Sequence, residues 1–260
     1  MTDISIVIPS FNQASFLPAT LDSVLKQEDA PTLQVVVVDG GSTDGTLEIL
    51  ESIDDPRVTW TSEPDRGQTH AINKGLAKTD GGVVAWLNSD DLYTPGSLRH
   101  VVDAFDADPD VRWVAGRVTI INESGEETRQ AVTRYKERRR RRYSYPSLLR
   151  ENFISQMGVF WRRSFGEMIG PLDESLHYTM DYDYWLRMGS HCDPLMLDRE
   201  LARFRWHDQS KSGAVSRAQF NEKYAVACRY FQGDRVSKAM HRFHAEKILW
   251  SYRLLKLLGR

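Results

Sequence analysis

The sequence Leu33-Gln34-Val35-Val36-Val37-Val38-Asp39-Gly40-Gly41 joins a run of valines to a carboxylate and two glycines. Similar apolar runs lie at residues 4–9 and 82–87, and helical patterns lie at residues 14–27, 46–53 and 68–77. Continuous apolar runs bounded by Gly, Pro and Asp are typical of buried parallel strands. Because these runs alternate with helices, we expect an α/β fold with a mostly parallel central sheet flanked by helices.

The residues that directly follow the strands are the candidate site, because ligands of such sheets bind beyond the carboxyl ends of the strands. Asp39 ends the second strand and is followed by glycines. Its carboxylate either accepts a hydrogen bond from a base or a ribose, or caps the next turn while the glycines supply the backbone conformation. Asp65, after the third strand region, is either a site residue or the N-cap of the next helix.

Two adjacent carboxylates, Asp90 and Asp91, follow the fourth strand. Neighbouring negative charges repel each other, and a divalent cation would compensate them. Mg²⁺ and Mn²⁺ are usually held by one or two carboxylates together with substrate phosphates. Capping of the turn before Tyr93 is the alternative role, but acidic residues at several strand ends along one edge favour a metal.

Taken together, these motifs resemble the family 2 glycosyltransferases in order and spacing. The motifs are Ile6-Val7-Ile8-Pro9-Ser10-Phe11-Asn12, Val38-Asp39-Gly40-Gly41-Ser42-Thr43-Asp44-Gly45-Thr46, Glu63-Pro64-Asp65-Arg66-Gly67 and Leu87-Asn88-Ser89-Asp90-Asp91. The resemblance extends from Asp3 to about Ser212 and implies a GT-A fold, with one nucleotide-sugar-binding α/β domain. Asn88 stands where the family more commonly has Asp, which leaves the role of that position open.

The resemblance also assigns the donor side of the site. The nucleotide-sugar pocket would be lined by Pro9, Phe11, Asp39, Asp65, Arg66 and Asp90. A divalent cation, Mn²⁺ or Mg²⁺, would be held by Asp90 and Asp91, with Asp91 the first choice for direct ligation. His207 follows a predicted strand, where related enzymes often have a histidine near the metal or the diphosphate; a solvated loop histidine is the alternative.

The acceptor side resembles the family as well. Segments 152–156, 160–164 and 170–176 recur there before Met180-Asp181-Tyr182-Asp183-Tyr184-Trp185-Leu186-Arg187, in which Met180 replaces the family's Glu. Asp181 stands where the family places its general base. Its alternative role is that of a carboxylate stabilised by the dipole at a helix N-terminus. In a helix Asp183 would point away from Asp181, because residues two apart do not share a face.

The implied reaction moves a sugar from a nucleotide-diphosphate donor, with a UDP-sugar favoured, to a hydroxyl of a glycan or lipid-linked acceptor in polysaccharide or glycolipid assembly. The cation would neutralise the leaving diphosphate. Asp181 would take the hydroxyl proton, and one displacement through an oxocarbenium-like state would invert the anomeric carbon.

Three other classes of protein remain as alternatives. A nucleotidyltransferase would usually carry a glycine-rich basic loop after the first strand, whereas Ser10–Ala14 contains neither Gly nor Lys. A non-catalytic nucleotide-sugar-binding protein would be suggested by loss of Asp91 or Asp181, and both are present. An S-adenosylmethionine enzyme would leave the Asp90-Asp91 pair unexplained.

The length of 260 residues fits one large α/β domain with a small appendage. We expect the glycosyltransferase domain at residues 1–213, with a nucleotide-binding half near 1–121 and an acceptor-side half near 122–213. Residues 214–260 have a helical pattern with no strand signal, and would form a C-terminal helical extension.

The composition limits the cellular setting. A formal net charge of −2 gives no support for a nucleic-acid partner. Two cysteines without a CxxC motif argue against a disulfide framework and favour a reducing compartment. The N-terminus has no signal-peptide pattern, and no apolar run approaches the roughly 20 residues that span a bilayer. We therefore expect a cytoplasmic protein.

A basic run extends from Arg134 to Arg142, and the last 30 or so residues interleave basic with apolar side chains near one helical face. One hypothesis is peripheral contact with an anionic membrane that carries a lipid-linked acceptor. Arginines could also hold a diphosphate of that acceptor bidentately. The alternative is that the apolar face packs on the domain or on a second subunit, and that the arginines form a solvated loop.

Overall fold

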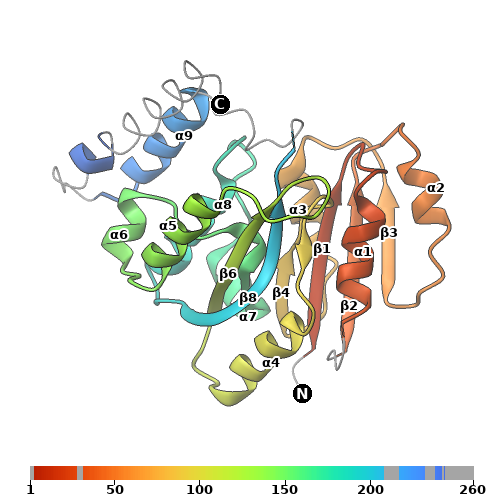
Figure 1. Cartoon of the computed structure of the whole chain (residues 1–260), viewed down its shortest axis with the longest axis horizontal. Helices are drawn as coiled ribbons and strands as arrows, with labels where there is room; N and C mark the ends of the chain where they lie inside the picture. The colour runs from red at the N-terminus through yellow and green to blue at the C-terminus, as the bar shows by residue number, and fades with distance from the viewer. Residues whose placement is uncertain (1–2, 28–31, 208–216, 232–237, 242, 244–260) are drawn as a thin grey trace.

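The computed structural model describes residues 3–27, 32–207, 217–231, 238–241 and 243. A sheet with the strand order β3-β2-β1-β4-β7-β6-β8-β5 runs through the molecule, and helices pack around it (Figure 1). The strands are β1 (Ile4–Ser10), β2 (Leu33–Asp39), β3 (Val58–Ser62), β4 (Val83–Trp86), β5 (Leu92–Tyr93), β6 (Trp113–Ile121), β7 (Val159–Arg162) and β8 (Leu195–Arg205).

The sheet is mostly parallel, as the sequence predicts. Strands β1 to β4 pair in parallel, and β6 pairs in parallel with β8. Strand β7 is antiparallel to both β4 and β6, and the short β5 is antiparallel to β8. The carboxyl ends of β1, β2, β4, β6 and β8 therefore lie along one edge.

The helices follow the predicted alternation in the first half of the chain. They are α1 (Leu17–Leu25), α2 (Thr46–Glu51), α3 (Gln68–Leu76), α4 (Ser97–Ala107), α5 (Gln130–Arg140), α6 (Tyr145–Arg150), a 3₁₀ turn at Gln156–Gly158, α7 (Arg163–Ile169), α8 (Met180–Gly189) and α9 (Arg217–Cys228). Helix α3 packs closely on β1, because a Cβ at Gly75 would lie 2.3 Å from the side chain of Val7. That contact leaves room for glycine alone.

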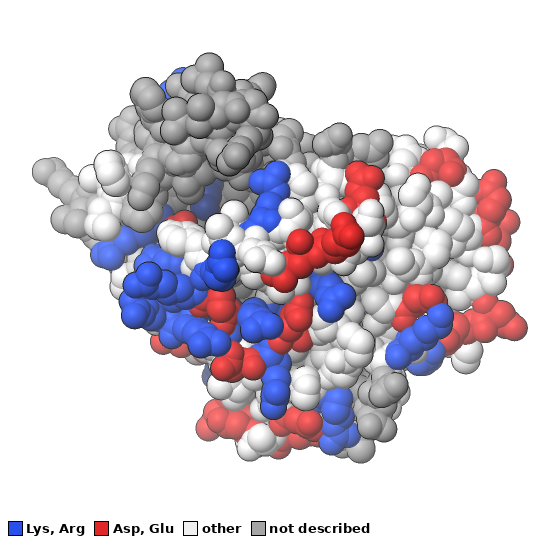
Figure 2. Space-filling model, in the orientation of Figure 1, with Lys and Arg blue, Asp and Glu red and all other residues white. Residues whose placement is uncertain are grey.

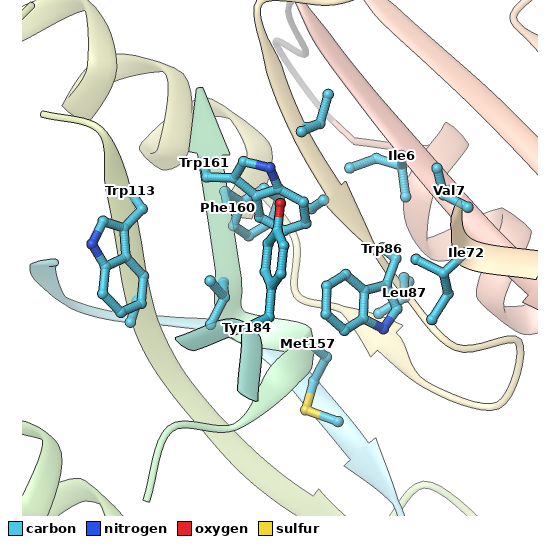
Figure 3. Packing of buried hydrophobic residues seen from close by; sticks show 14 of the residues in the cluster. Ile6, Val7, Ile72, Trp86, Leu87, Trp113, Met157, Phe160, Trp161 and Tyr184 are labelled. Carbon is cyan, nitrogen blue, oxygen red and sulfur yellow. The ribbon is translucent and has the colours of Figure 1, made fainter. Parts of the chain in front are cut away.

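Four buried tryptophans connect the two halves of the sheet. Trp86 ends β4, Trp161 lies on β7, Trp113 begins β6 and Trp185 lies on α8. The Trp86 and Trp185 rings stack with centroids 5.5 Å apart, and Trp113 stacks on the other side of Trp185 at 6.1 Å. Figure 3 shows Trp86, Trp113 and Trp161 among the other side chains of the buried core. The strand that leads to Asp90 is thereby fixed to the helix that carries Asp181.

The basic run is not a solvated loop. It forms most of α5, and Arg140 points inward, where it pairs with Glu137 at 2.8 Å and donates to the Ala115 carbonyl oxygen. Arg141 bridges Glu137 and Asp198 on the surface. Figure 2 shows a cationic patch on this side of the molecule. The interpretation of the run as a loop was wrong, because ion pairs and a buried carbonyl stabilise the arginines in a helix.

The C-terminal extension is helical where the structure describes it, at α9 and at residues 238–241. The expected domain boundary near residue 213 and the basic and apolar residues after 243 lie outside the described residues. None of the described helices is both long and apolar enough to cross a membrane.

Candidate functional site

The loops after β1 and β2 are joined to each other at the carboxyl edge of the sheet. The Asn12 side chain accepts from the Thr43 backbone N–H at 2.9 Å, and the Ser42 hydroxyl accepts from the Asn12 backbone N–H at 2.7 Å. Asp44 accepts from the Ala14 backbone N–H at 2.9 Å. These hydrogen bonds join the two loops into one preorganised surface, which we call the floor of the site. The sequence shows the two loops only as separate motifs.

Asp39 is fully buried beneath this floor. Its Oδ2 atom accepts from the backbone N–H groups of Gly41 and Ser42 at 3.0 and 2.9 Å, and from the Ser62 hydroxyl at 2.6 Å. Its Oδ1 atom accepts from the Ser42 hydroxyl. The turn-capping role considered from the sequence is thus present, and contact with a nucleoside stays a prediction for this residue.

Gly40 packs closely against the side chains of Asp65 and Phe11. A Cβ at Gly40 would lie 2.8 Å from Asp65 Oδ2 and 3.3 Å from the Phe11 ring. The Phe11 side chain is 58% exposed, so its ring is open to stack on a ligand. Pro9 lies two residues before Phe11 in the sequence. It is buried, and it pairs in register with Val38 of β2.

Arg66 lies on the rim of the same region. It is exposed, and its guanidinium donates to Glu174 at 2.6 Å. Glu174 belongs to the acceptor-side segment 170–176. Asp65 is half-buried and accepts from the Gly67 backbone N–H at 2.6 Å, just before α3 begins. The N-cap of α3 is Gly67 and no side chain caps the helix, so the N-cap alternative for Asp65 was wrong, while Arg66 links the donor and acceptor halves.

The adjacent carboxylates Asp90 and Asp91 have opposite environments. Asp91 is fully buried, with Oδ1 accepting from the Arg205 backbone N–H at 2.9 Å and Oδ2 from the Asn88 amide at 3.1 Å. Burial, and then the charge of Asp90, raises the pKa of Asp91 well above its usual range. Both oxygens of Asp91 are therefore occupied within the protein, whereas the Asp90 side chain is 15% exposed and is the more accessible of the two carboxylates.

His207 lies directly beside Asp90. Its Nε2 atom is 2.9 Å from Asp90 Oδ2, and its ring packs 4.7 Å from the Phe16 ring. The histidine is buried, so it is not the solvated loop residue considered as an alternative. Within the described residues no three His, Cys, Asp or Glu side chains converge on one point. One carboxylate and one imidazole nonetheless fit a Mg²⁺ or Mn²⁺ ion that completes its shell with substrate phosphates.

Asp181 lies in the first turn of α8 and is half-buried. Its Oδ1 atom accepts from the Tyr182 backbone N–H at 2.7 Å, and its Oδ2 atom accepts from the Asn152 amide at 3.3 Å. Burial raises its pKa, while Lys136 and Lys223 act in the opposite direction. A carboxylate with a raised pKa and few partners suits a general base.

Asp183 has a different set of partners. It is buried and accepts from Arg187 at 3.0 Å and from the Tyr230 hydroxyl at 2.9 Å. Tyr230 follows α9, so this carboxylate helps fix the C-terminal extension to α8. The expectation that Asp181 and Asp183 face apart agrees with these contacts.

Several residues around Asp181 have a place in the site that the sequence did not predict. Asn152 lay inside a quoted motif without a role, Lys136 was counted with the arginines, and Lys223 was assigned nothing. A helical projection of residues 130–140 would separate Lys136 from Arg134 and Arg138. No local pattern could bring Lys223, more than 40 residues after Asp181, into the same site.

Comparisons with known proteins agree with this geometry. The model of the family "Glycosyl transferase family 2" matches residues 5–168, more than half of the chain. An uncharacterized glycosyltransferase of Rickettsia typhi is 26% identical over 98% of this chain and 72% of its own length. The chondroitin synthase of Pasteurella multocida is 26% identical over 72% of this chain and 19% of its own length.

Solved structures show the same fold. S. aureus TarS 1-349 in complex with UDP-GlcNAc superposes with a TM-score of 0.69 at 17% identity, covering 92% of this chain and 69% of that one. The mannosyltransferase PcManGT from Pyrobaculum calidifontis, in complex with GDP-Man and Mn²⁺, gives 0.66 at 19% identity, covering 98% and 80%. These similarities confirm the expected GT-A fold. The chain belongs to glycosyl transferase family 2 and is a nucleotide-sugar-dependent glycosyltransferase.

Proposed function

We propose that this enzyme is an inverting, divalent-metal-dependent glycosyltransferase that acts on an acceptor hydroxyl in polysaccharide or glycolipid assembly. The observation that carries the proposal is that two carboxylates, Asp90 and Asp181, have different environments. Asp90 lies 2.9 Å from an imidazole nitrogen, as a metal ligand would, whereas Asp181 has a raised pKa, as a base would.

The donor would occupy the floor formed by the loops after β1 and β2. Its base would stack on the exposed ring of Phe11, which lies beside Gly40. Asp90 and His207 would hold Mn²⁺ or Mg²⁺, which supplies charge neutralisation for the leaving diphosphate. Asp91 would orient this pair from beneath, through the Arg205 backbone N–H.

The acceptor would approach from the α8 side. Trp185 lies one helical turn after Asp181 and stacks on Trp86, so the base lies close to the end of β4 that leads to Asp90. Asp181 would remove the hydroxyl proton as the oxygen attacks the anomeric carbon. A single displacement then gives inversion and needs no covalent intermediate on the enzyme.

Two donor bases, uracil and guanine, are candidates. One structural neighbour was solved with UDP-GlcNAc and another with GDP-Man and Mn²⁺. We retain a UDP-sugar as the first donor to test, with GDP-sugars as the second. Location at the inner face of a membrane is likewise a proposal, based on the cationic patch of α5.

The test is incubation of the protein with a panel of UDP- and GDP-sugars, with Mn²⁺, Mg²⁺ or excess EDTA. We expect release of nucleoside diphosphate that depends on the metal. A nucleotidyltransferase would form or consume pyrophosphate instead, and a non-catalytic protein would bind the donor without releasing diphosphate. Full turnover in EDTA would refute the metal dependence, and a retained anomeric configuration in the product would refute inversion.

A further inference from the structure

Two lysines from distant parts of the chain lie near Asp181, the proposed base. Lys136 lies on α5 and Lys223 on α9, both are half-buried, and both act electrostatically on Asp181. Lys136 donates to the Ser155 hydroxyl at 3.2 Å, and the Lys223 ammonium lies 5.6 Å from the centre of the Tyr182 ring. Within the described residues neither lysine forms an ion pair at 4.0 Å or less.

The carboxylates nearby do not balance these two charges. Glu151 acts electrostatically on both lysines, but it also accepts from the Tyr135 hydroxyl at 2.7 Å and lies 3.6 Å from the Arg139 guanidinium. Two carboxylates, Glu151 and Asp181, therefore face three cations, Lys136, Lys223 and Arg139. Half-buried charge without a partner is unfavourable, because desolvation is not offset by attraction. Burial lowers the pKa of both lysines, that of Lys223 to about 8, in agreement with this deficit of negative charge.

The deficit grows during the proposed reaction. The bond from the acceptor oxygen to the anomeric carbon forms, the bond from that carbon to the diphosphate breaks, and its electron pair leaves with the nucleoside diphosphate. The hydroxyl proton passes to Asp181, which becomes neutral. Of these five groups Glu151 alone would then be negatively charged, unless the acceptor itself carries negative charge.

We propose that Lys136 and Lys223 bind an anionic group of the acceptor, a phosphate or a carboxylate, next to the hydroxyl that Asp181 deprotonates. The inference rests on the proposed function, because it takes Asp181 to be the base. An acceptor anion compensates both lysines before and after proton transfer. It also fixes the reacting hydroxyl against Asp181, as charge-assisted hydrogen bonds give both affinity and orientation.

The test uses three probes that share one sugar ring: methyl β-D-glucoside, the corresponding methyl glucuronide, and the glucoside 6-phosphate. Each is titrated into ¹⁵N-labelled protein saturated with UDP and Mg²⁺, and amide shifts on α5 and α9 are followed. We expect at least one anionic probe to bind at least about tenfold more tightly than the neutral glucoside, as one charge-assisted hydrogen bond would provide. Comparison of the two anionic probes separates carboxylate from phosphate.

The variants make the test specific. The double variant K136Q/K223Q should lose the preference for the anion, and K136R/K223R should keep it because the charge is retained. The control K26Q/K78Q removes the same charge at exposed lysines remote from Asp181. Equal binding of the three probes by the wild type, or no binding of either anionic probe, would overturn the inference. UDP binding is recorded first, so failure of the donor site is seen separately.

Discussion

At the scale of single residues, Asp90 and Asp91 show what a motif alone cannot distinguish. The two side chains are identical and adjacent, but one lies beside His207 while the other is buried against the Arg205 backbone N–H. The family resemblance favours Asp91 as the direct ligand, but a sequence motif does not say which way each side chain points. The choice depends on which way the chain turns after β4, and Thr20 fixes that turn by donating to the Ser89 and Asp91 carbonyl oxygens.

The first prediction compares the two aspartates. Asp90→Asn should weaken Mn²⁺ binding in the presence of UDP by at least about tenfold, because it removes the accessible anionic ligand. Asp91→Asn should change metal affinity much less and act mainly on stability. Calorimetric titration of Mn²⁺ into each UDP-saturated variant measures the difference. A larger loss of affinity in Asp91→Asn would restore Asp91 as the direct ligand.

The second prediction concerns Asp181 and pH. Asp181 accepts a proton only when ionised, so turnover should fall as pH drops through its raised pKa. Asp181→Asn should lower turnover by about 10²–10⁴-fold with donor affinity kept. Lys136→Gln should move the acidic limb of the pH–rate profile to higher pH, because loss of a nearby positive charge raises the Asp181 pKa further. Lys223, Asn152 and the Tyr182 N–H remain as stabilising partners. A limb that does not move would exclude this coupling.

At the scale of elements, α8 depends on α9. Glu222 of α9 accepts hydrogen bonds from the backbone N–H groups of His177, Tyr178 and Thr179, at 3.0, 2.7 and 2.8 Å, just before α8 begins. Burial acts to raise the pKa of Glu222, but these bonds and that from the Thr179 hydroxyl outweigh it, and the pKa is lowered. An element beyond the family match at residues 5–168 therefore positions the helix of the proposed base.

The third prediction tests this cap. Glu222→Gln should lower the free energy of unfolding by about 1.5–3 kcal/mol at neutral pH, as expected for lost hydrogen bonds to a charged group. Because the folded pKa is lowered, the wild-type advantage is present above the unfolded pKa near 4.5 and is lost as pH falls through the folded value. Urea unfolding at pH 7 and at pH 3.5 measures both, with Glu51→Gln, an exposed carboxylate, as the control. An equal difference at both pH values would contradict the role.

Some elements of the fold could be predicted from the sequence, and others could not. The buried strands and their order in the first half follow from apolar runs such as Val35–Val38, because parallel strands covered on both faces need no alternation. The environment of Lys136 could not be predicted, since its partners Ser155 and Asp181 are close only after α5 folds back on the sheet. The link of Glu222 to residues 177–179 likewise joins segments that share no local pattern.

At the scale of the whole molecule, the cationic patch on α5 is smaller than the sequence suggests. Arg139, Arg140 and Arg141 pair with Glu151, Glu137 and Asp198. Within the basic run 134–142, the exposed guanidinium groups without an ion pair to a described residue are those of Arg134, Arg138 and Arg142. A membrane contact through α5 would therefore rest on three charges, together with whatever residues 244–260 contribute.

The fourth prediction follows from that number. Each cationic side chain near an anionic surface contributes about 1 kcal/mol, so three would give weak binding that high salt abolishes. Co-sedimentation with phosphatidylserine-containing and neutral vesicles should show salt-sensitive binding to the anionic ones only. The variant R134S/R138S/R142S should bind less, whereas Arg141→Ser, which removes a paired charge, should bind nearly as well. Binding equal to wild type in the triple variant would remove α5 from the contact.

The stacked tryptophans have one more consequence, which is optical. Trp86 and Trp185 are two chromophores with ring centroids 5.5 Å apart, one on the strand leading to Asp90 and the other on the helix that begins beside Asp181. Their excited states couple strongly at this separation, and the coupling depends on their relative angle. Separation of β4 from α8, as on unfolding, would therefore alter the near-ultraviolet circular dichroism of the unlabelled enzyme. The chain carries its own gauge of the contact between β4 and α8, readable without any dye.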